Sequence, residues 1–294
     1  MSLLTNLDGV IGPTAHISVL DRGFLYGDSV YEVVRTFQGR LFGLQEHLDR
    51  LRQSADSIYM RVPWSDSQIQ AEVERTLQQT HWLESYVRIV VSRGTETKVS
   101  LQPSRDLKPS LLIVISEIDP QPQLSQIGIH LQVVNRLRND HRALSPAAKT
   151  GNYLNNILAL LEAQQQGADD ALLLNGQGQV TEATTSNLWI VRQGSVQTPP
   201  PSVGILQGIT RHFLVQILQR HQIPYAETLL LPSDLTQAEE AFLSSSVRLL
   251  MPINRIDQMP LPHCPGPMTR WLWDELLAEM DRAVTENIPL AQSA

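Results

Sequence analysis

The sequence predicts an α/β protein, of the α+β kind, that folds as two domains. Three observations lead to this prediction. The chain has 294 residues, which is long for one hydrophobic core and suits two domains of roughly 100–200 residues. Runs rich in β-branched residues alternate with amphipathic helical patterns. A polar segment with two prolines, residues 117–126, interrupts this pattern and is typical of a linker.

The first half predicts two helices and several strands. Leu44, Leu48, Leu51 and Ala55 recur at helical spacing, and Ser65 is placed to cap a second helix. The helices are expected at residues 44–58 and 66–80. Strands are expected at residues 30–37, 40–42, 86–92 and 111–116, with Gln38-Gly39 as a hairpin turn. We expect these strands to pair mostly antiparallel.

The second half predicts a sheet or barrel that helices cover, because several strand-like runs are apolar on both faces. Strands are expected at residues 129–134, 171–174, 187–191 and 241–244, and helices at 153–165, 209–222 and 268–284. We therefore divide the chain into an N-terminal α/β domain at 1–118, a linker at 119–127 and a C-terminal domain at 128–294.

Composition argues against several classes of protein. With 23 Lys+Arg against 30 Asp+Glu, the net charge of -7 does not suit a nucleic-acid-binding surface. The N-terminus lacks a signal-peptide pattern, and no apolar run approaches the roughly 20 residues of a membrane span. The single cysteine, Cys264, cannot form an internal disulfide. We predict a cytoplasmic protein that binds neither nucleic acid nor membranes and holds no metal.

Lysine is rare in this chain, and one lysine has unusual neighbours. Only Lys98, Lys108 and Lys149 occur, and Lys149 lies among small residues in Ala147-Ala148-Lys149-Thr150-Gly151 just before a predicted helix. Partial desolvation in such a loop keeps an amine ready for Schiff-base chemistry. The local composition alone favours an exposed loop lysine, whereas residues farther along the chain favour a cofactor-binding one.

Glu182 is the second candidate. It lies in Thr181-Glu182-Ala183-Thr184-Thr185-Ser186, between two strand-like runs. A single acid among hydroxyl groups suits a buried carboxylate that hydrogen bonds keep ionised. Such a carboxylate can hold the ring nitrogen of pyridoxal phosphate protonated, so that the ring acts as an electron sink. A surface turn residue would show the same local pattern.

A glycine-flanked turn opens the predicted helix 209–222 and suits a phosphate. The turn reads Gly204-Ile205-Leu206-Gln207-Gly208, and the start of a helix presents backbone N–H groups and a positive dipole end. Many loops carry glycine before a helix, so this signal is weak by itself. Ser246 offers a further hydroxyl group.

Taken in order, these motifs resemble the class IV aminotransferases, the fold-type IV pyridoxal phosphate enzymes. That family includes branched-chain and D-amino-acid aminotransferases and aminodeoxychorismate lyase. The resemblance runs from Leu20-Asp21-Arg22-Gly23-Phe24-Leu25-Tyr26-Gly27-Asp28 to Met251-Pro252-Ile253. It implies a small α/β N-terminal domain, a larger C-terminal domain with a barrel-like sheet, pyridoxal 5'-phosphate as cofactor, and a homodimer.

The resemblance also implies roles for single residues. Lys149 matches the Schiff-base lysine, and Glu182 matches the partner of the pyridine nitrogen. Tyr153 resembles the tyrosine that hydrogen-bonds the ring hydroxyl, with packing in the core as the alternative. The residues that match the phosphate-binding positions are Arg50, Ile209, Thr210 and Ser246.

The substrate is where the motifs diverge. Tyr86-Val87-Arg88 resembles the branched-chain enzymes, in which the tyrosine helps to hold the substrate carboxylate and the arginine accommodates the side chain of glutamate. Tyr26 matches an active-site tyrosine of the same enzymes. Alternate residues on one strand face would give Tyr86 and Arg88 the same spacing.

Two further positions bear on the substrate. Tyr31, in Tyr31-Glu32-Val33-Val34-Arg35, resembles the D-amino-acid enzymes, but Lys98 and Ser100 stand where those enzymes use an Arg-x-His pair. Val247 lies in Ser246-Val247-Arg248, where many members have small residues and an acid, and it belongs to the expected substrate pocket.

These residues predict an aminotransferase that moves the amino group of an aliphatic, branched-chain-like L-amino acid to a 2-oxo acid. The freed amine of Lys149 would act as the general base at the substrate Cα, with ping-pong kinetics. The alternatives are a D-amino-acid aminotransferase, an aminodeoxychorismate lyase that forms 4-aminobenzoate, and a non-catalytic binding protein on the same scaffold.

Overall fold

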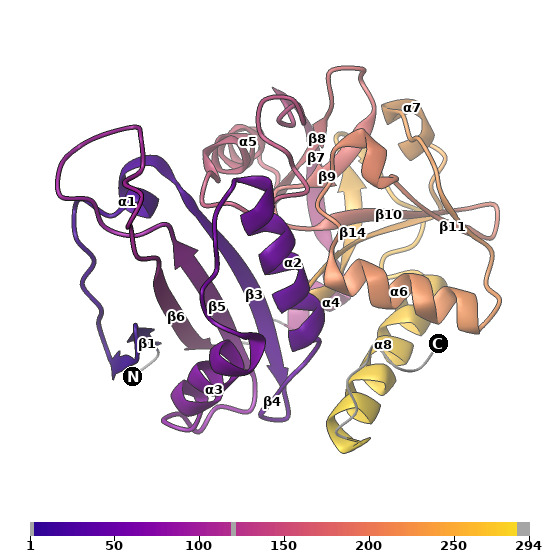
Figure 1. Ribbon diagram of the computed structural model, residues 1–294. Coiled ribbons are helices and arrows are strands. Elements are labelled where there is room, and N and C mark those ends of the chain that lie inside the picture. The colour runs from indigo at the N-terminus through magenta and orange to yellow at the C-terminus, as the bar shows by residue number, and fades with distance from the viewer. Residues whose placement is uncertain (1–2, 119–121, 287–294) are drawn as a thin grey trace. The chain divides into compact units, whose positions relative to one another are not determined.

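The computed structural model describes residues 3–118 and 122–286 (Figure 1). By compactness the chain divides into two units. The first comprises Met1–Asp119, Ala148–Asn152 and Met280–Ala294, and the second comprises Pro120–Ala147 and Tyr153–Glu279. Lys149 groups with the first unit, although we placed it in the C-terminal domain. Of the expected linker, residues 119–121 lie outside the described residues, and Pro122–Ile127 forms helix α4. The domain limits themselves stay a prediction.

An antiparallel sheet of six strands forms the first unit, as expected. The strand order is β2-β1-β6-β5-β3-β4. The strands are β1 (Leu3–Leu7), β2 (Val10–Gly12), β3 (Ser29–Phe37), β4 (Arg40–Leu41), β5 (Ser85–Ser92) and β6 (Ser110–Glu117). The helices are α1 (Arg22–Tyr26), α2 (Leu44–Ser57) and α3 (Asp66–Leu77). The two helices predicted for this half are confirmed, and Ser65 caps α3 in a capping box with Gln68.

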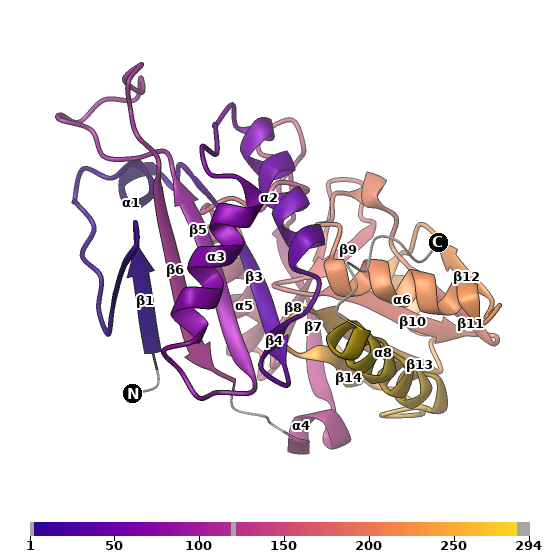
Figure 2. The same cartoon turned by 60° about the horizontal axis from the view of Figure 1, so that its bottom comes forward.

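The two faces of this sheet differ in what they carry. Figures 1 and 2 place α2 and α3 over the same face. Val30, Val34 and Ile89 are fully buried in the core that this face shares with the helices. Because side chains alternate along a strand, Glu32 lies on this helix-covered face, while Tyr31 and Arg88 lie on the opposite one.

Residues 148–152 form an additional edge of this sheet. The Tyr31 N–H donates to the Lys149 carbonyl at 2.9 Å, and the Gly151 N–H donates to the Ser29 carbonyl at 2.9 Å. Val30 and Thr150 form an antiparallel bridge between these hydrogen bonds. The segment predicted as a lysine-bearing loop is therefore fixed to β3 by its backbone.

A closed six-stranded barrel forms the second unit, which confirms the barrel-like sheet. Neighbouring strands follow the order β9-β10-β13-β14-β7-β8, and β8 pairs with β9 to close the ring. The barrel strands are β7 (Ile129–Leu137), β8 (Asp170–Leu174), β9 (Val180–Ala183), β10 (Asn187–Arg192), β13 (Glu240–Ser245) and β14 (Leu249–Ile256). Outside the ring lie β11 (Ser195–Thr198), β12 (Tyr225–Glu227) and β15 (Met259–Pro260).

Helices cover the barrel as expected. Helix α5 (Leu154–Gln165) packs against β7 and β8, and α6 (Ile209–Arg220) packs against β13. The Arg220 guanidinium lies 2.8 Å from the Glu279 carboxylate, which ties α6 to α8 (Pro267–Glu286). The remaining helical segments are η1 (Pro201–Val203) and α7 (Pro232–Leu235). In the described part of the chain, every helix is too short or too polar to span a membrane.

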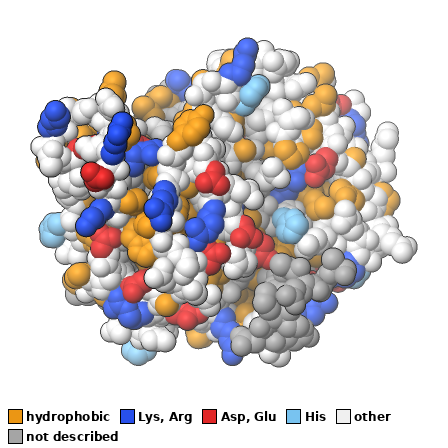
Figure 3. Space-filling model, viewed as in Figure 1, with side chains coloured by type: hydrophobic (Ala, Val, Ile, Leu, Met, Phe, Trp, Pro, Cys, Tyr) orange, Lys and Arg blue, Asp and Glu red, His pale blue; other side chains and the backbone are white. Residues whose placement is uncertain are grey.

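The surface carries both signs of charge. On the face in Figure 3, Lys and Arg side chains are interspersed with Asp and Glu. Residues 3–118 and 122–286 contain no group of three or more His, Cys, Asp or Glu side chains that could hold a metal ion.

Candidate active site

Lys149 is held at its backbone while its amine lies beside an aromatic ring. The Lys149 N–H donates to the Ser54 hydroxyl on α2 at 3.0 Å, and its carbonyl accepts from Tyr31. The Lys149 Nζ lies 4.5 Å from the centroid of the Tyr31 ring. Tyr31 is 3% exposed, and the lysine is half-buried. The lysine is therefore not the exposed loop residue that local composition alone would favour.

The Tyr31 ring also contacts Arg88. The Arg88 guanidinium carbon lies 3.7 Å from the ring centroid, and Arg88 Nη1 lies 3.5 Å from the Tyr86 hydroxyl. The antiparallel register pairs Arg88 with Val33 and Tyr86 with Arg35. Val33 and Arg35 are on the same face of β3 as Tyr31, so the side chains of Tyr31, Arg88 and Tyr86 belong to one face of the sheet. A cation over an aromatic face is a favourable contact, and here the Arg88 guanidinium and the Lys149 amine both lie close to one ring.

Behind β3, three buried polar side chains form a cluster that the sequence did not predict. The Glu32 carboxylate accepts from Arg50 Nε and Nη2, each at 2.7 Å, and lies 2.7 Å from His47 Nδ1. Burial raises the pKa of Glu32, but the charge and hydrogen bonds of Arg50 outweigh it and hold the pKa well below its usual range. Burial lowers the pKa of His47 despite its bond to Glu32, so the imidazole is uncharged at neutral pH.

Glu182 is buried on strand β9 and surrounded by donors. Its side chain is 6% exposed, and Oε1 accepts from Arg138 Nε at 3.1 Å and Nη2 at 2.8 Å. Oε2 accepts from the Asn187 amide at 3.2 Å and from the Leu206 N–H at 3.1 Å. The alternative of a surface turn residue is therefore wrong. Four N–H donors, two of them on a cationic guanidinium, favour the ionised form of this carboxylate.

Arg138 was missed by the sequence analysis. Its Nη1 donates to Asn156 on α5 at 3.2 Å, and the Asn156 amide donates to the Thr184 carbonyl at 2.6 Å. Arg138 also lines a cavity of about 700 Å³ in the second unit, together with residues 139–142 and 201–205. The signal was weak because several arginines lie between residues 136 and 142, and only the fold selects one.

The start of α6 is a close-fitting turn without a side-chain cap. Gly208 is the N-cap residue and makes no side-chain hydrogen bond. A Cβ at this position would lie 2.2 Å from the Asn187 Oδ1, so any larger residue would force this buried amide to move. Ile209 and Thr210, both buried, supply the first N–H groups of the helix, which suit an anion.

The remaining predicted residues lie at the ends of elements. Tyr153 is the N-cap residue of α5, and Ser246 and Val247 lie in the turn between β13 and β14. Tyr26 ends α1, where its ring lies 5.1 Å from the Arg22 guanidinium. Within the first unit, the structure brings together Lys149, Tyr31, Arg88 and Tyr86. Within the second, Asn187 links Glu182 to Leu206, in the turn that precedes α6.

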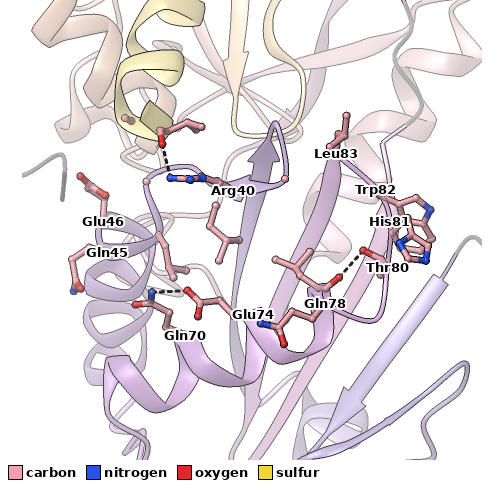
Figure 4. Close-up of a pocket in the computed structure, with 17 residues that line it drawn as sticks. Arg40, Gln45, Glu46, Gln70, Glu74, Gln78, Thr80, His81, Trp82 and Leu83 are labelled. Carbon is pink, nitrogen blue, oxygen red and sulfur yellow. Dashed lines mark hydrogen bonds between the residues drawn. The ribbon is translucent and has the colours of Figure 1, made fainter. Parts of the chain in front are cut away.

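A separate groove of about 760 Å³ lies in the first unit. It is lined by the β3–β4 turn, α2, α3 and the end of α8, and Arg40 donates to the Val284 carbonyl across it at 2.7 Å (Figure 4). Its seventeen described lining residues include none of the predicted site residues. This groove is therefore distinct from the candidate site.

The family model "Amino-transferase class IV" matches residues 29–256 of the chain. This chain belongs to the class IV aminotransferases. It is therefore a pyridoxal phosphate-dependent transferase that acts on amino acids and 2-oxo acids, as expected. The alternative of a non-catalytic binding protein is therefore wrong.

Relatives carry two different names. A Methanocaldococcus jannaschii protein, provisionally named a branched-chain-amino-acid aminotransferase, is 36% identical over 83% of each chain. A D-alanine aminotransferase of Listeria monocytogenes is 31% identical over 98% of this chain and 99% of its own. The branched-chain amino acid aminotransferase of Thermobaculum terrenum, solved in its PLP form, has a TM-score of 0.85 and 26% identity, covering 94% of this chain and 93% of its own.

The side chains of each unit suit pyridoxal phosphate. The buried Glu182 carboxylate, which is paired with Arg138, suits a protonated pyridine nitrogen. The uncapped N-terminus of α6 suits the phosphate. The half-buried Lys149, with its backbone fixed, offers an amine to the aldehyde.

Proposed function

We propose that Lys149 covalently binds pyridoxal phosphate and acts as the general base of transamination. The observation that carries the proposal is the position of the lysine, one of three in the chain, with both backbone groups bonded and its Nζ beside Tyr31. Bound pyridoxal phosphate supplies an electron sink for the pair of electrons left at the substrate Cα. Once the amino group of the substrate has displaced it from the cofactor carbon, the Lys149 amine would take the proton from that Cα and return it to the cofactor carbon.

The other cofactor contacts follow from the chemistry of each donor. We infer that Glu182 binds the pyridine nitrogen and that Tyr153 bonds the ring hydroxyl. The phosphate, by this proposal, is bound by Arg50, Ile209, Thr210 and Ser246. Arginine suits phosphate because its planar N–H groups bind two oxygens at once, and the helix start adds backbone donors.

Chemical trapping tests the lysine assignment. The purified chain is expected to be yellow, and borohydride reduction followed by peptide mapping should place the pyridoxyl group on Lys149. The variant Lys149→Ala should carry no reduced cofactor, whereas Lys108→Ala should carry as much as the unmodified chain. Label on Lys98 or Lys108 would contradict the proposal.

For the substrate, we propose an aliphatic, branched-chain-like L-amino acid with 2-oxoglutarate as acceptor. Arg88 lies against the Tyr31 ring and near the Tyr86 hydroxyl, and all three side chains are on the same face of the sheet. A guanidinium next to two aromatic rings can bind a side-chain carboxylate, while the rings accept an aliphatic group. Tyr26 and Val247 are the further substrate contacts of this proposal. The relative from Methanocaldococcus jannaschii supports a branched-chain substrate.

A D-amino-acid substrate is the second candidate, because several relatives are D-alanine aminotransferases. Against it, Lys98 and Ser100 stand where an Arg-x-His pair is expected. Ser100 is held in place: its carbonyl accepts from Arg22 and its hydroxyl donates to the Gln102 carbonyl. A panel of L- and D-amino acids with 2-oxoglutarate or pyruvate decides between the two. Turnover of D-alanine but not of L-leucine would refute our choice. Formation of 4-aminobenzoate from aminodeoxychorismate without a 2-oxo acid would select the lyase.

We also propose a homodimer in the cytoplasm. On α5, Leu154, Ile157 and Leu161 are 65%, 48% and 48% exposed and recur at helical spacing, which gives the helix an apolar outer stripe. A second copy of the chain would cover such a stripe. Sedimentation should show a dimer that Ile157→Asp dissociates, and a monomer in the unmodified chain would contradict this.

A further inference from the structure

We propose that Glu32 is a positioning residue for Arg50, and through Arg50 for the phosphate end of the cofactor. This inference rests on the phosphate-binding role proposed above for Arg50. Glu32 itself lies on the helix-covered face of β3 and has no assigned role in the reaction.

The Glu32 carboxylate fixes the plane of the guanidinium. Oε1 accepts from Nε and Oε2 accepts from Nη2, both at 2.7 Å. Two parallel N–H···O bonds leave a guanidinium little freedom to rotate or tilt. They occupy the edge formed by Nε and Nη2, so the direction in which Nη1 points is set by the carboxylate.

The carboxylate is itself fixed from two sides. Glu32 is fully buried on β3, a strand that pairs with β5 along its length. His47 Nδ1 lies 2.7 Å from Oε2, and the uncharged imidazole donates there without adding a second positive charge. His47 and Arg50 are three residues apart on α2 and therefore reach the carboxylate from adjacent positions of one helix.

The same helix face also holds the lysine segment. Ser54, four residues after Arg50 on α2, accepts the backbone N–H of Lys149 at 3.0 Å. Arg50 and the Lys149 backbone are thus both attached to one rigid helix. A change that shifts Arg50 relative to β3 alters the distance between the phosphate-binding and amine-bearing groups of this unit.

A purely structural ion pair is the alternative explanation. Buried pairs often contribute little to stability, and removing one partner destabilises the fold whatever its function. The test must therefore separate loss of stability from loss of phosphate recognition. Pyridoxal, which lacks the phosphate, makes this separation possible because it shares the ring and the aldehyde with pyridoxal phosphate.

The experiment compares the dissociation constants of the cofactor-free, full-length chain for pyridoxal phosphate and for pyridoxal. In Glu32→Gln we expect the constant for pyridoxal phosphate to rise about 10- to 100-fold, the effect of losing a charge-assisted contact. The constant for pyridoxal should change less than about 3-fold, because no phosphate contact is involved. Arg50→Ala should give the same pattern, and the double variant should lose no more than Arg50→Ala alone.

A matched control involves another arginine of the same helix, Arg52, whose carboxylate partner Asp66 is the first residue of α3. Asp66 binds Arg52 on α2, so Asp66→Asn also removes the carboxylate partner of an α2 arginine, and it should leave both dissociation constants unchanged. Glu32→Asp keeps the charge but withdraws the carboxylate by one methylene, and it decides the question if Glu32→Gln does not fold. The melting temperature of each cofactor-free variant reports stability independently.

The outcomes separate the two proposals. Equal losses for pyridoxal phosphate and pyridoxal in the Glu32 variants, or additive losses in the double variant, would overturn the positioning role alone. An unchanged preference for the phosphate in Arg50→Ala would overturn the phosphate role of Arg50, and the inference with it.

Discussion

Glu182→Gln is the substitution for which the structure gives the firmest magnitude. The carboxylate accepts four hydrogen bonds, two on each oxygen. A glutamine amide retains one accepting oxygen. Its NH₂ group then faces either the Arg138 guanidinium or the donors of Asn187 and Leu206. In both orientations two donors lose their acceptor, and Arg138 loses its counter-charge inside the protein.

These losses lower the free energy of unfolding even when no cofactor is bound. Leaving one partner of a buried pair uncompensated costs roughly 3–5 kcal/mol. Because glutamine still accepts at one oxygen, we expect a loss near the lower end, about 3 kcal/mol, which lowers the melting temperature of an unfolding unit of about 150–250 residues by roughly 6–12 °C. The matched control is Glu275→Gln on α8, which changes the partly exposed carboxylate that contacts His221. Its free energy of unfolding should stay within about 0.5 kcal/mol of that of the unmodified chain.

The same substitution should slow the reaction. A neutral amide cannot hold the pyridine nitrogen protonated, and one such electrostatic contact contributes roughly 3–4 kcal/mol, or 10²–10³ in rate. Calorimetry of the cofactor-free chain measures the first effect, and single-turnover absorbance with L-leucine measures the second. An unchanged melting temperature would refute the buried contact with Arg138. A near-normal rate in a destabilised variant would refute the role at the ring nitrogen.

Three further predictions concern the first unit. In Arg88→Ala, kcat/KM of the half-reaction with glutamate should fall roughly 10- to 100-fold while that with leucine changes little, because only glutamate uses a charge-assisted contact; equal losses in single-turnover assays would indicate a structural role. Ser54→Ala should cost about 1 kcal/mol, because the backbone N–H of Lys149 loses its acceptor; thermal unfolding measures this, and an unchanged melting temperature would argue against the bond. Burial raises the pKa of Asp28, but hydrogen bonds from Arg93 and Arg22 outweigh it and lower the pKa. The carboxylate therefore stabilises the fold above its ordinary pKa, and this contribution is lost as the pH falls below about 4. Asp28→Asn should be destabilised at pH 7 and converge with the unmodified chain in acid, and a difference that stays constant down to pH 2 would contradict the assignment.

Periodicity predicted most of the elements that the structure contains. The spacing of Leu44, Leu48 and Leu51 predicted α2, which begins at Leu44. Strands with apolar residues on both faces predicted the barrel, and β10 and β13 are buried nearly throughout. These predictions succeeded because burial imposes a period of 2 or 3.6 on a single segment.

Features that depend on contacts between distant segments were not predictable in this way. Strand β14 contains Pro252, which argues against a central strand, yet β14 lies between β13 and β7 and has a register shift after Ile253. Glu182 was expected between two strands, but it lies on β9. This strand was missed because the short run Val180–Ala183 gives little periodic signal. The contact of Glu32 with Arg50 joins a strand to a helix, and only the packing of α2 on β3 brings them together.

The attachment of residues 148–152 to β3 has a consequence for how such a chain can be divided or recombined. Both flanking stretches, 120–147 and 153–279, group with the other unit, and the chain returns to the first unit again at Met280. A fragment that stops near residue 118 would lack the hydrogen-bonding partner of Ser29 and Tyr31, and a fragment that starts near residue 128 would carry that partner away. A single crossover at the linker between two members of the family would therefore pair the β3 of one parent with the lysine segment of the other. In hybrid enzymes of this kind, residues 148–152 and the N-terminal sheet should therefore come from the same parent, although they are separated in the sequence.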